Sequence, residues 1–270
     1  MKTYVITGAT QGIGRGIALQ QLKAGNKVIA IGSSVKNGRS LVNEARALKL
    51  DANIEFLQAN LSLISENERV IESIKSDYSH IDGLILCAAK HSQSYTVTRE
   101  RFETTLALVY LSRYKLTYGL QELLEKGTEP FILNFGITGL KGDVNWDDLG
   151  FKKNFAPMKV MLHGSLLNDL LAVQFVESNP SSNIHYILHN PGAVKNSGMD
   201  AIGGIVMKIV MKLMGKTVDK AIKPIGEIIA NRPADKLISF TQKRVNPLTL
   251  KSFNKAYAKL LDELTKQMLG

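Results

Sequence analysis

Cysteine is nearly absent from the 270-residue sequence, in which Cys87 stands alone. A single thiol excludes an internal disulfide framework and fits a reducing compartment, so we expect a cytoplasmic protein. No apolar run reaches the roughly 20 residues of a membrane-spanning helix, and from the strand-like start we expect no signal peptide. No linker rich in glycine, serine or proline divides the chain. We therefore expect one domain over residues 1–270.

Massed charge is also missing, although the formal net charge is +10 from 34 basic and 24 acidic residues. The basic residues are spread along the chain, and no stripe alternates them with aromatic residues. This distribution indicates a solvated surface and argues against a nucleic-acid-binding face. The excess positive charge would nevertheless attract a ligand that carries phosphate.

Short apolar segments alternate with longer amphipathic ones. Strands are expected at 3–9, 27–32, 54–60, 83–89, 131–136 and 184–190, with a weaker seventh at 236–240. Most are apolar throughout, as in a parallel sheet that is covered on both faces. The pattern predicts an α/β fold, namely a single-domain Rossmann fold whose doubly wound parallel sheet of about seven strands carries helices on both faces.

The most apolar helix candidate is the segment 201–215, which is too short to cross a bilayer. It follows the carboxyl end of the sixth predicted strand, where such sheets bind ligands. We expect a lid-like substrate segment at about 195–225. A helix lying on a membrane surface is the alternative, because Lys208 and Lys212 share one face.

The segment "TGATQGIG", residues 7–14, follows the first strand and opens the first helix. Gly8 permits the tight turn, Gly12 allows the backbone to approach a pyrophosphate, and Gly14 allows close packing of the helix. The free N–H groups and the partial positive charge of a helix N-terminus favour phosphate. Strand, glycine loop and helix occur in the order that a dinucleotide site requires.

This loop resembles that of the short-chain dehydrogenases/reductases, T-G-x-x-x-G-x-G, with matches at Thr7, Gly8, Gly12 and Gly14. Later segments resemble the family too, and the layout is most similar to the branch that includes retinol-dehydrogenase-like members. The resemblance implies a nicotinamide cofactor held by these loop residues and by Thr10, Gln11, Ile13, Arg15, Asn60, Leu61, Ala88, Ala89, Pro191, Gly192, Val194 and Asn196. It implies no metal.

The end of the second predicted strand bears on the choice of nucleotide. Gly32 stands where an acid would accept hydrogen bonds from a ribose 2′-OH and repel a 2′-phosphate. The side chains nearby in sequence are hydroxyl or basic, namely Ser33, Ser34, Lys36, Arg39 and Arg15. This combination favours NADP(H) over NAD(H).

Family members transfer hydride with a Tyr-x-x-x-Lys pair, a Ser and a helix Asn. The Tyr exchanges a proton with the substrate oxygen, and the Lys lowers its pKa. The pair falls either on Phe155 and Lys159 or on Met161 and Ser165. The second register is favoured, because Pro157 would interrupt the helix in the first and begin it in the second. Neither register supplies a tyrosine.

The other positions of the tetrad are altered as well. Asn168 continues the second register as Lys-x-x-Asn does in the resembling branch, but Val109 occupies the helix Asn position and Ile137 the Ser position. Thr138 would substitute for the Ser if the loop were shifted by one residue. Four replacements remove groups that act as a unit, so the family's usual acid–base step should be lost.

Two histidines are weaker candidates for a replacement proton donor. His91 follows the fourth strand near the ligand-facing edge, and His163 lies on the helix of Met161. A histidine at either place is more often structural or solvent-exposed than catalytic.

Three functions remain open. The chain is expected to be a divergent catalyst for a hydrophobic small molecule, reducing an electrophile such as an imine or directing a cyclisation or isomerisation. The alternatives are a nucleotide-binding regulatory or scaffold protein and, least favoured, an ordinary NADPH-dependent carbonyl reductase. A homodimer or homotetramer would form through the segments 99–124 and 157–178, as in many family members.

Overall fold

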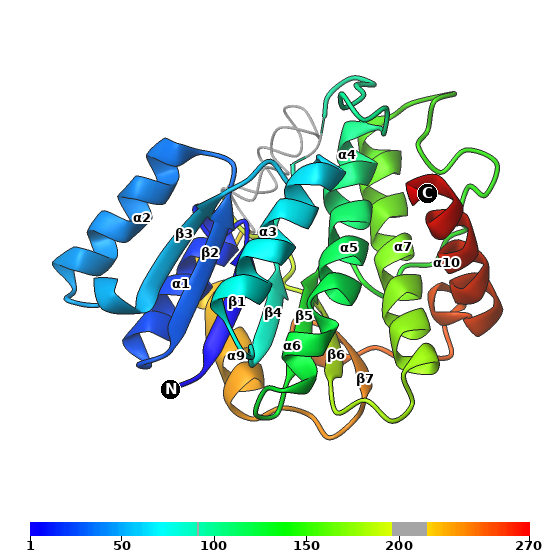
Figure 1. Cartoon of the computed structure of the whole chain (residues 1–270). Helices are drawn as coiled ribbons and strands as arrows, with labels where there is room; N and C mark the ends of the chain where they lie inside the picture. The colour runs from blue at the N-terminus through cyan, green and yellow to red at the C-terminus, as the bar shows by residue number, and fades with distance from the viewer. Residues whose placement is uncertain (91, 196–214) are drawn as a thin grey trace.

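A computed structural model describes residues 1–90, 92–195 and 215–270, and its centre is one eight-stranded sheet (Figure 1). The strands are Thr3–Thr7 (β1), Lys27–Gly32 (β2), Ile54–Gln58 (β3), Gly83–Leu86 (β4), Phe131–Phe135 (β5), His185–Asn190 (β6), Leu237–Thr241 (β7) and Arg244–Val245 (β8). Their order is β3-β2-β1-β4-β5-β6-β7-β8. The first seven pair in parallel and β8 returns antiparallel to β7. The predicted α/β Rossmann-like fold is confirmed.

Helices cover both faces of the sheet. They are Gly12–Lys23 (α1), Val35–Ala47 (α2), Ile64–Asp77 (α3), Thr104–Leu106 (α4), Ser112–Gly119 (α5), Gln121–Glu125 (α6), Pro157–Ser178 (α7), Val218–Ala230 (α9) and Lys255–Leu269 (α10). A π-helical turn, Ala107–Leu111 (η2), joins α4 to α5. The described residues also include the 3₁₀ turns Asp51–Asn53 (η1) and Lys251–Phe253 (η4). The side chains of α3, α5, α7 and α10 form one apolar core, and those of α1, α2 and α9 form the other.

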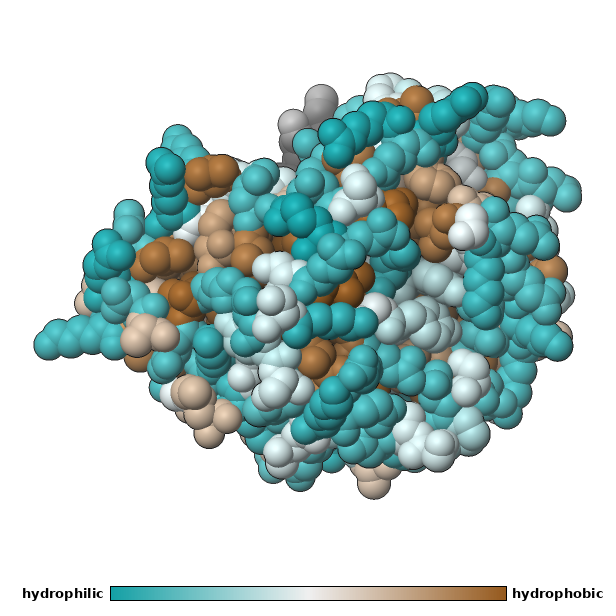
Figure 2. All heavy atoms as spheres, viewed as in Figure 1, coloured by the Kyte–Doolittle hydropathy of each residue, from teal (hydrophilic) through white to brown (hydrophobic). Residues whose placement is uncertain are grey.

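The strand predictions agree with the structure to within a few residues at their ends. The short β8 is an addition that the sequence pattern did not indicate. Residues 196–214, which hold most of the expected lid, lie outside the described residues. No helix in the described parts of the chain has the length and apolar character needed to cross a membrane. The face seen in Figure 2 is mainly hydrophilic, and polar side chains divide its apolar areas.

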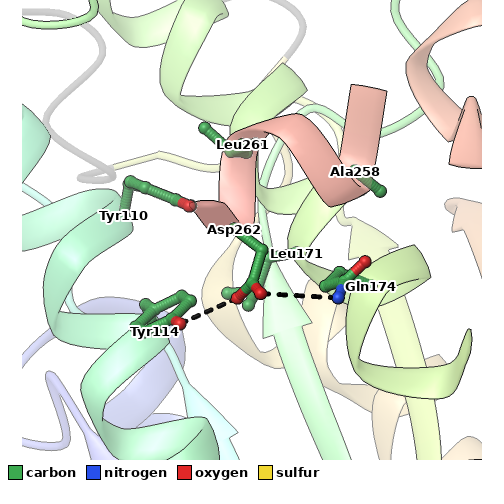
Figure 3. Close-up of a pocket in the computed structure, with 7 residues that line it drawn as sticks. All are labelled: Tyr110, Tyr114, Leu171, Gln174, Ala258, Leu261 and Asp262. Carbon is green, nitrogen blue, oxygen red and sulfur yellow. Dashed lines mark hydrogen bonds between the residues drawn. The ribbon is translucent and has the colours of Figure 1, made fainter. Parts of the chain in front are cut away.

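The last helix, α10, packs along α7 and reaches α5 (Figure 3). At its centre the buried carboxylate of Asp262 accepts a hydrogen bond of 2.8 Å from the hydroxyl of Tyr114 and one of 3.5 Å from Gln174. The hydroxyls of Tyr110 and Thr265 lie 2.6 Å apart. These polar contacts fix the register of α10 against two helices whose outer faces are otherwise apolar.

Candidate active site

The turn after β1 is tied to the neighbouring strand β4. The hydroxyl oxygen of Thr7 accepts hydrogen bonds of 3.1 Å from the backbone N–H groups of both Cys87 and Ala88. Gly8 follows with φ of +64°, and a Cβ on it would lie 2.9 Å from the backbone of Ala88. Only glycine meets both conditions, because the left-handed region disfavours side chains and no space remains for one.

The loop then closes on itself as it enters α1. A Cβ on Gly14 would lie 2.4 Å from the carbonyl oxygen of Gly8, and Gly12 has φ of +53°. No side chain caps the N-terminus of α1, and its first turn holds no acid. The N–H groups at this end of the helix therefore remain free for an anionic ligand.

The other residues of this loop that were predicted to contact the cofactor have different surroundings. Gln11 is exposed and Ile13 is half-buried beside it. The side chain of Thr10 packs on Gly32, where a Cβ would lie 2.7 Å from its methyl group. Arg15 forms an ion pair of 2.6 Å with Glu44 of α2 and donates to the carbonyl oxygen of Thr10 at 3.4 Å. Its charge is therefore matched within the protein.

At the end of β2, no acidic side chain stands at the tip of the strand. Ser34 caps α2 by accepting a hydrogen bond of 3.2 Å from the N–H of Asn37. Ser33, Lys36 and Arg39 are exposed around this cap. The close approach of Thr10 to Gly32 leaves no space at position 32 for the carboxylate that would mark a ribose-binding acid.

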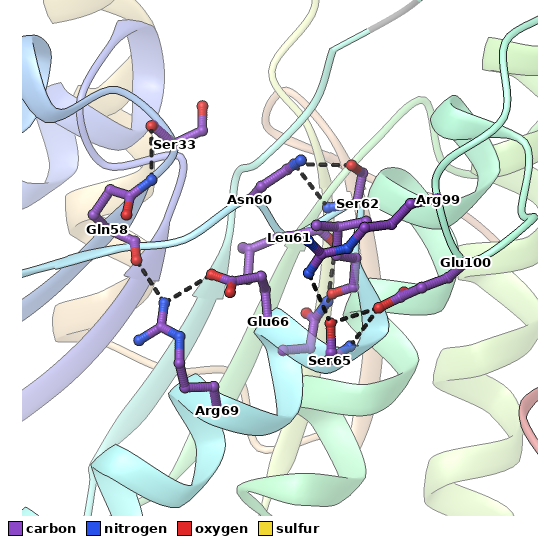
Figure 4. A network of polar contacts seen from close by, with 12 residues as sticks. Ser33, Gln58, Asn60, Leu61, Ser62, Ser65, Glu66, Arg69, Arg99 and Glu100 are labelled. Atoms are coloured by element: carbon purple, nitrogen blue, oxygen red, sulfur yellow. Dashed lines mark hydrogen bonds and ion pairs between the residues drawn. The ribbon is translucent and has the colours of Figure 1, made fainter.

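A polar network joins β3, α3 and the loop that follows β4 (Figure 4). The side-chain oxygen of exposed Asn60 accepts hydrogen bonds from the N–H and hydroxyl of Ser62 at 3.3 and 2.8 Å, and Leu61 between them is buried. The carboxylate of Glu100 accepts from the hydroxyl and N–H of Ser65 and from the N–H of Ile64 at the start of α3. Burial raises the pKa of Glu100, but these hydrogen bonds outweigh it, and the net shift is downward.

The segment after β6 forms another side of the site. Gly192 has φ of +76°, and a Cβ on it would lie 2.9 Å from the side-chain amide of Gln242. Pro191 is half-buried and Val194 is buried. Val194 forms a parallel bridge with Lys216, whose N–H donates to the carbonyl oxygen of Ala193 and whose carbonyl oxygen accepts from the N–H of Lys195. Ala88 and Ala89 lie at the neighbouring end of β4, and Ala89 is exposed. Asn196 is outside the described residues.

The structure brings together the positions of the second register. Pro157 is the first residue of α7, as predicted, and Phe155 precedes the helix. The hydroxyl of Ser165 donates to the carbonyl oxygen of Met161 at 3.2 Å and accepts from the N–H of Ile137 at 3.3 Å. Met161 and Ser165 are both buried. The three residues predicted to occupy the Tyr, Lys and Ser positions of the family thus lie together, and their side chains end in a thioether, a hydroxyl and an alkyl group.

Val109, predicted to occupy the Asn position, lies on the π-helical turn η2. Asn168 of α7 donates to the carbonyl oxygen of Val109 at 2.8 Å and to that of Gly164 at 2.6 Å. Its own side-chain oxygen accepts from Asn134 of β5 at 3.0 Å. This buried chain of amides couples η2, α7 and β5. It holds the backbone at the predicted tetrad positions independently of their side chains.

A buried cation, which the sequence analysis did not single out, lies behind this cluster. Arg113 of α5 is 4% exposed and donates to Asn134 Oδ1 and the carbonyl oxygen of Phe135, both at 2.6 Å, and to the carbonyl oxygen of Ala88 at 3.2 Å. Burial lowers its pKa to about 10, so it remains charged at neutral pH. The available signal was its spacing, four residues after Val109 on the buried side of a helix.

Two other candidates are engaged in holding the loop between β5 and α7. Thr138 is buried, and its hydroxyl donates to Asp169 at 2.6 Å and lies 2.8 Å from Ser239. Nε2 of buried His163 accepts from the N–H of Asn145 at 3.1 Å, and burial lowers the pKa of this imidazole to about 4. Both side chains therefore have structural partners, and His91 lies outside the described residues.

With the site in view, comparisons with known proteins decide the family. The model of the family described as short chain dehydrogenase matches residues 2–144. This chain belongs to the short-chain dehydrogenase family. Retinol dehydrogenase 12 of Mus musculus is 26% identical over 194 residues, covering 72% of this chain and 61% of the relative. The NmrA-like family domain-containing oxidoreductase notO of an Aspergillus species is 26% identical over 200 residues, covering 71% and 60%.

The retinol-dehydrogenase-like resemblance is thereby confirmed, while the matched region spans less than two thirds of these relatives' own lengths. Among solved structures, a short-chain dehydrogenase from Sphingobium yanoikuyae in complex with NADPH has a TM-score of 0.68 at 18% identity, covering 100% of this chain and 95% of that one. An alcohol dehydrogenase from Thermococcus sibiricus with 5-hydroxy-NADP also has a TM-score of 0.68, at 16% identity and with 90% and 98% coverage. These two share the fold.

Proposed function

We propose that this chain binds NADP(H) and uses it on a hydrophobic small molecule in a reaction that takes no proton from a tyrosine–lysine pair. One contrast carries the proposal. The glycine loop is complete, whereas the cluster that family members use for proton transfer holds Met161, Ser165 and Ile137.

The residues present fit the nucleotide. The cradle of Gly8 and Gly14, which a Cβ would fill, and the uncapped start of α1 suit a pyrophosphate. Ser33, Lys36 and Arg39 would hold a 2′-phosphate beside Gly32. The complexes of two structural relatives with NADPH and 5-hydroxy-NADP agree with this choice. When bound, the nicotinamide supplies a hydride.

The chemistry of the substrate follows from the missing acid. A ketone needs a proton on its oxygen as hydride arrives, and this cluster offers no phenol for it. An iminium carbon accepts hydride and gives a neutral amine without that proton. The protein's own contribution is then to orient the electrophile and exclude water. Cyclisation or isomerisation of a bound substrate would use the same cluster without hydride transfer.

A second candidate is a nucleotide-binding regulatory protein that turns nothing over. It is favoured because Ser165 and Met161 are both buried, and the hydroxyl of Ser165 already donates to the carbonyl oxygen of Met161. An ordinary carbonyl reductase has the least support.

Nucleotide titration by fluorescence, followed by mass spectrometry of cyclic imines and their ketone analogues, separates these functions. We expect NADPH to bind at least about tenfold more tightly than NADH, because one phosphate adds charge-assisted hydrogen bonds. We also expect NADPH to be consumed with imines and not with ketones. Tight binding without turnover would favour the regulatory protein, and equal turnover of ketones would contradict the proposal.

A further inference from the structure

The guanidinium of Arg113 is a buried charge without a carboxylate partner among the residues that the structure describes. All three of its hydrogen-bond acceptors are neutral oxygens, from Asn134, Phe135 and Ala88. Its Nε likewise has no hydrogen-bond partner among these described residues. A buried charge is costly unless it is paired, so a lone one is a site at which function rather than stability is expected.

This charge lies close to Met161, Ser165 and Ile137, which we call the hydride-transfer cluster. A Cβ placed on Gly136 would lie 4.0 Å from Arg113 Nη1 and 3.7 Å from the hydroxyl of Ser165. Ser165 occupies the position of the family's lysine. The guanidinium and the hydroxyl of Ser165 therefore border the same space beside Gly136, so a positive charge from a different helix reaches the neighbourhood of the predicted lysine position.

Its backbone contacts fix it there. One acceptor, the carbonyl oxygen of Ala88, lies just past the end of β4, and another, that of Phe135, lies at the end of β5. In the sheet, β4 adjoins β1 and β5 follows β4. Asn134 links the guanidinium to Asn168 of α7. The charge cannot swing away as an exposed lysine would, because three acceptors on two strands hold it.

We infer that Arg113 makes the site selective for the reduced nucleotide, by placing an unpaired positive charge beside the nicotinamide end of the cofactor. The oxidised ring is positively charged and the reduced ring is neutral, so a nearby cation disfavours only the oxidised form. This inference rests on the proposed binding of NADP(H) and deepens it. The protein would hold NADPH ready to donate hydride and would release NADP⁺.

The test is the ratio of the dissociation constants of NADP⁺ and NADPH, measured by calorimetry without any substrate. Arg113→Met removes the charge. Arg113→Gln removes the charge and keeps an amide donor for the side-chain oxygen of Asn134. Both variants should lower the ratio on the order of tenfold, as expected for one unit charge several ångströms away in a partly screened interior.

Two controls separate charge from structure. Arg113→Lys keeps the charge and should retain most of the ratio. Lys115→Met removes a charge two residues along the same helix, where the lysine is partly exposed and paired with Glu68, and should leave the ratio unchanged. If Arg113→Met does not fold, Arg113→Gln still decides.

A ratio that stays within twofold of the parent in the charge-removing variants, while both nucleotides bind, would overturn the inference. A parent that binds neither nucleotide would instead remove the proposed function, and this inference with it. The two failures are therefore distinguishable.

Discussion

The nucleotide loop and the hydride-transfer cluster lie on one edge of one sheet, yet their residues are constrained in different ways. In the loop, the backbone itself is the recognition element. Gly8 combines a positive φ with a 2.9 Å approach to Ala88, so any other residue would deform the turn. Substitution of the glycines in such a loop therefore changes its backbone conformation.

In the cluster, side chains carry the chemistry and the backbone is held independently. Asn168 bonds to the carbonyl oxygen of Val109 and to Asn134, which fixes η2, α7 and β5 whatever occupies positions 109, 137 and 161. Chemical groups can therefore be exchanged there at little cost to the fold. Under the proposed function, this difference would allow a family's reactive groups to change while its ligand is kept.

The largest effect is expected where the loop's backbone is altered. Gly12→Val should abolish NADPH binding, weakening it by at least about a hundredfold, because the side chain crowds the phosphate and φ is +53°. Gly25→Val is the matched control. Gly25 has φ of +80° and open space around its Cβ position, in the turn between α1 and β2, so it carries similar backbone strain away from the loop.

Titration of both variants with NADPH, alongside thermal melting, checks this. Unchanged binding by Gly12→Val would show that the loop does not hold the nucleotide. Equal losses in both variants would show that strain alone explains the effect.

A smaller effect is expected from introducing the missing pair into the cluster. Met161→Tyr with Ser165→Lys should give little carbonyl reduction while Arg113 is present, because two buried cations would then face the same space beside Gly136. Adding Arg113→Met should relieve the repulsion, raise the melting temperature by several degrees, and raise ketone-dependent NADPH oxidation at least about tenfold.

Phe155→Tyr with Arg113→Met is the comparison variant for register. Phe155 precedes α7 and lies 6.0 Å from the ring of Tyr95, measured between centroids. Ketone reduction by this variant, and not by the triple variant, would reverse the assignment of the positions.

The last effect concerns the stability of the loop that borders the cluster, and it depends on pH. His163 is neutral in the fold with a pKa of about 4, against 6.5 in the unfolded chain. Between these values the unfolded state binds the additional proton, so the contribution of His163 is complete above pH 6.5 and is lost as the pH falls toward 4. The loss amounts to at most about 3 kcal/mol.

His163→Gln keeps an acceptor for the N–H of Asn145 and does not titrate. Denaturant unfolding at pH 7 and pH 5 should therefore show a smaller acid loss in this variant than in the parent. Asp169, whose pKa burial raises to about 7, opposes the trend in both proteins and cancels in the difference. Equal losses would contradict the structural role of His163.

Much of the fold could be predicted from the sequence because its signals are local. Apolar segments of strand length, the glycine loop and the proline at the start of α7 each act over a few neighbouring residues. The two-residue strand β8 gave no such signal, since so short a segment shows no periodicity. The contact of α10 with α5 depends on Asp262 meeting Tyr114 across 148 positions, which no local pattern encodes.

The site was predictable to the extent that it follows motifs. The spacing of Met161 and Ser165 indicated that they share a helix face, and the structure adds that Ile137 joins them. Arg113 was missed because a charged residue in a helix is normally solvated, and only tertiary packing removes it from water. Thr138 looked available for catalysis in the sequence, whereas folding brings Asp169 to its hydroxyl.

The seal that α10 forms over α5 and α7 has a consequence for self-assembly. A second copy approaching through these two helices would first have to displace the last 15-residue helix, breaking the contacts of Asp262 and Thr265. The C-terminal helix of the same chain thus occupies part of the apolar surface through which a second copy would bind.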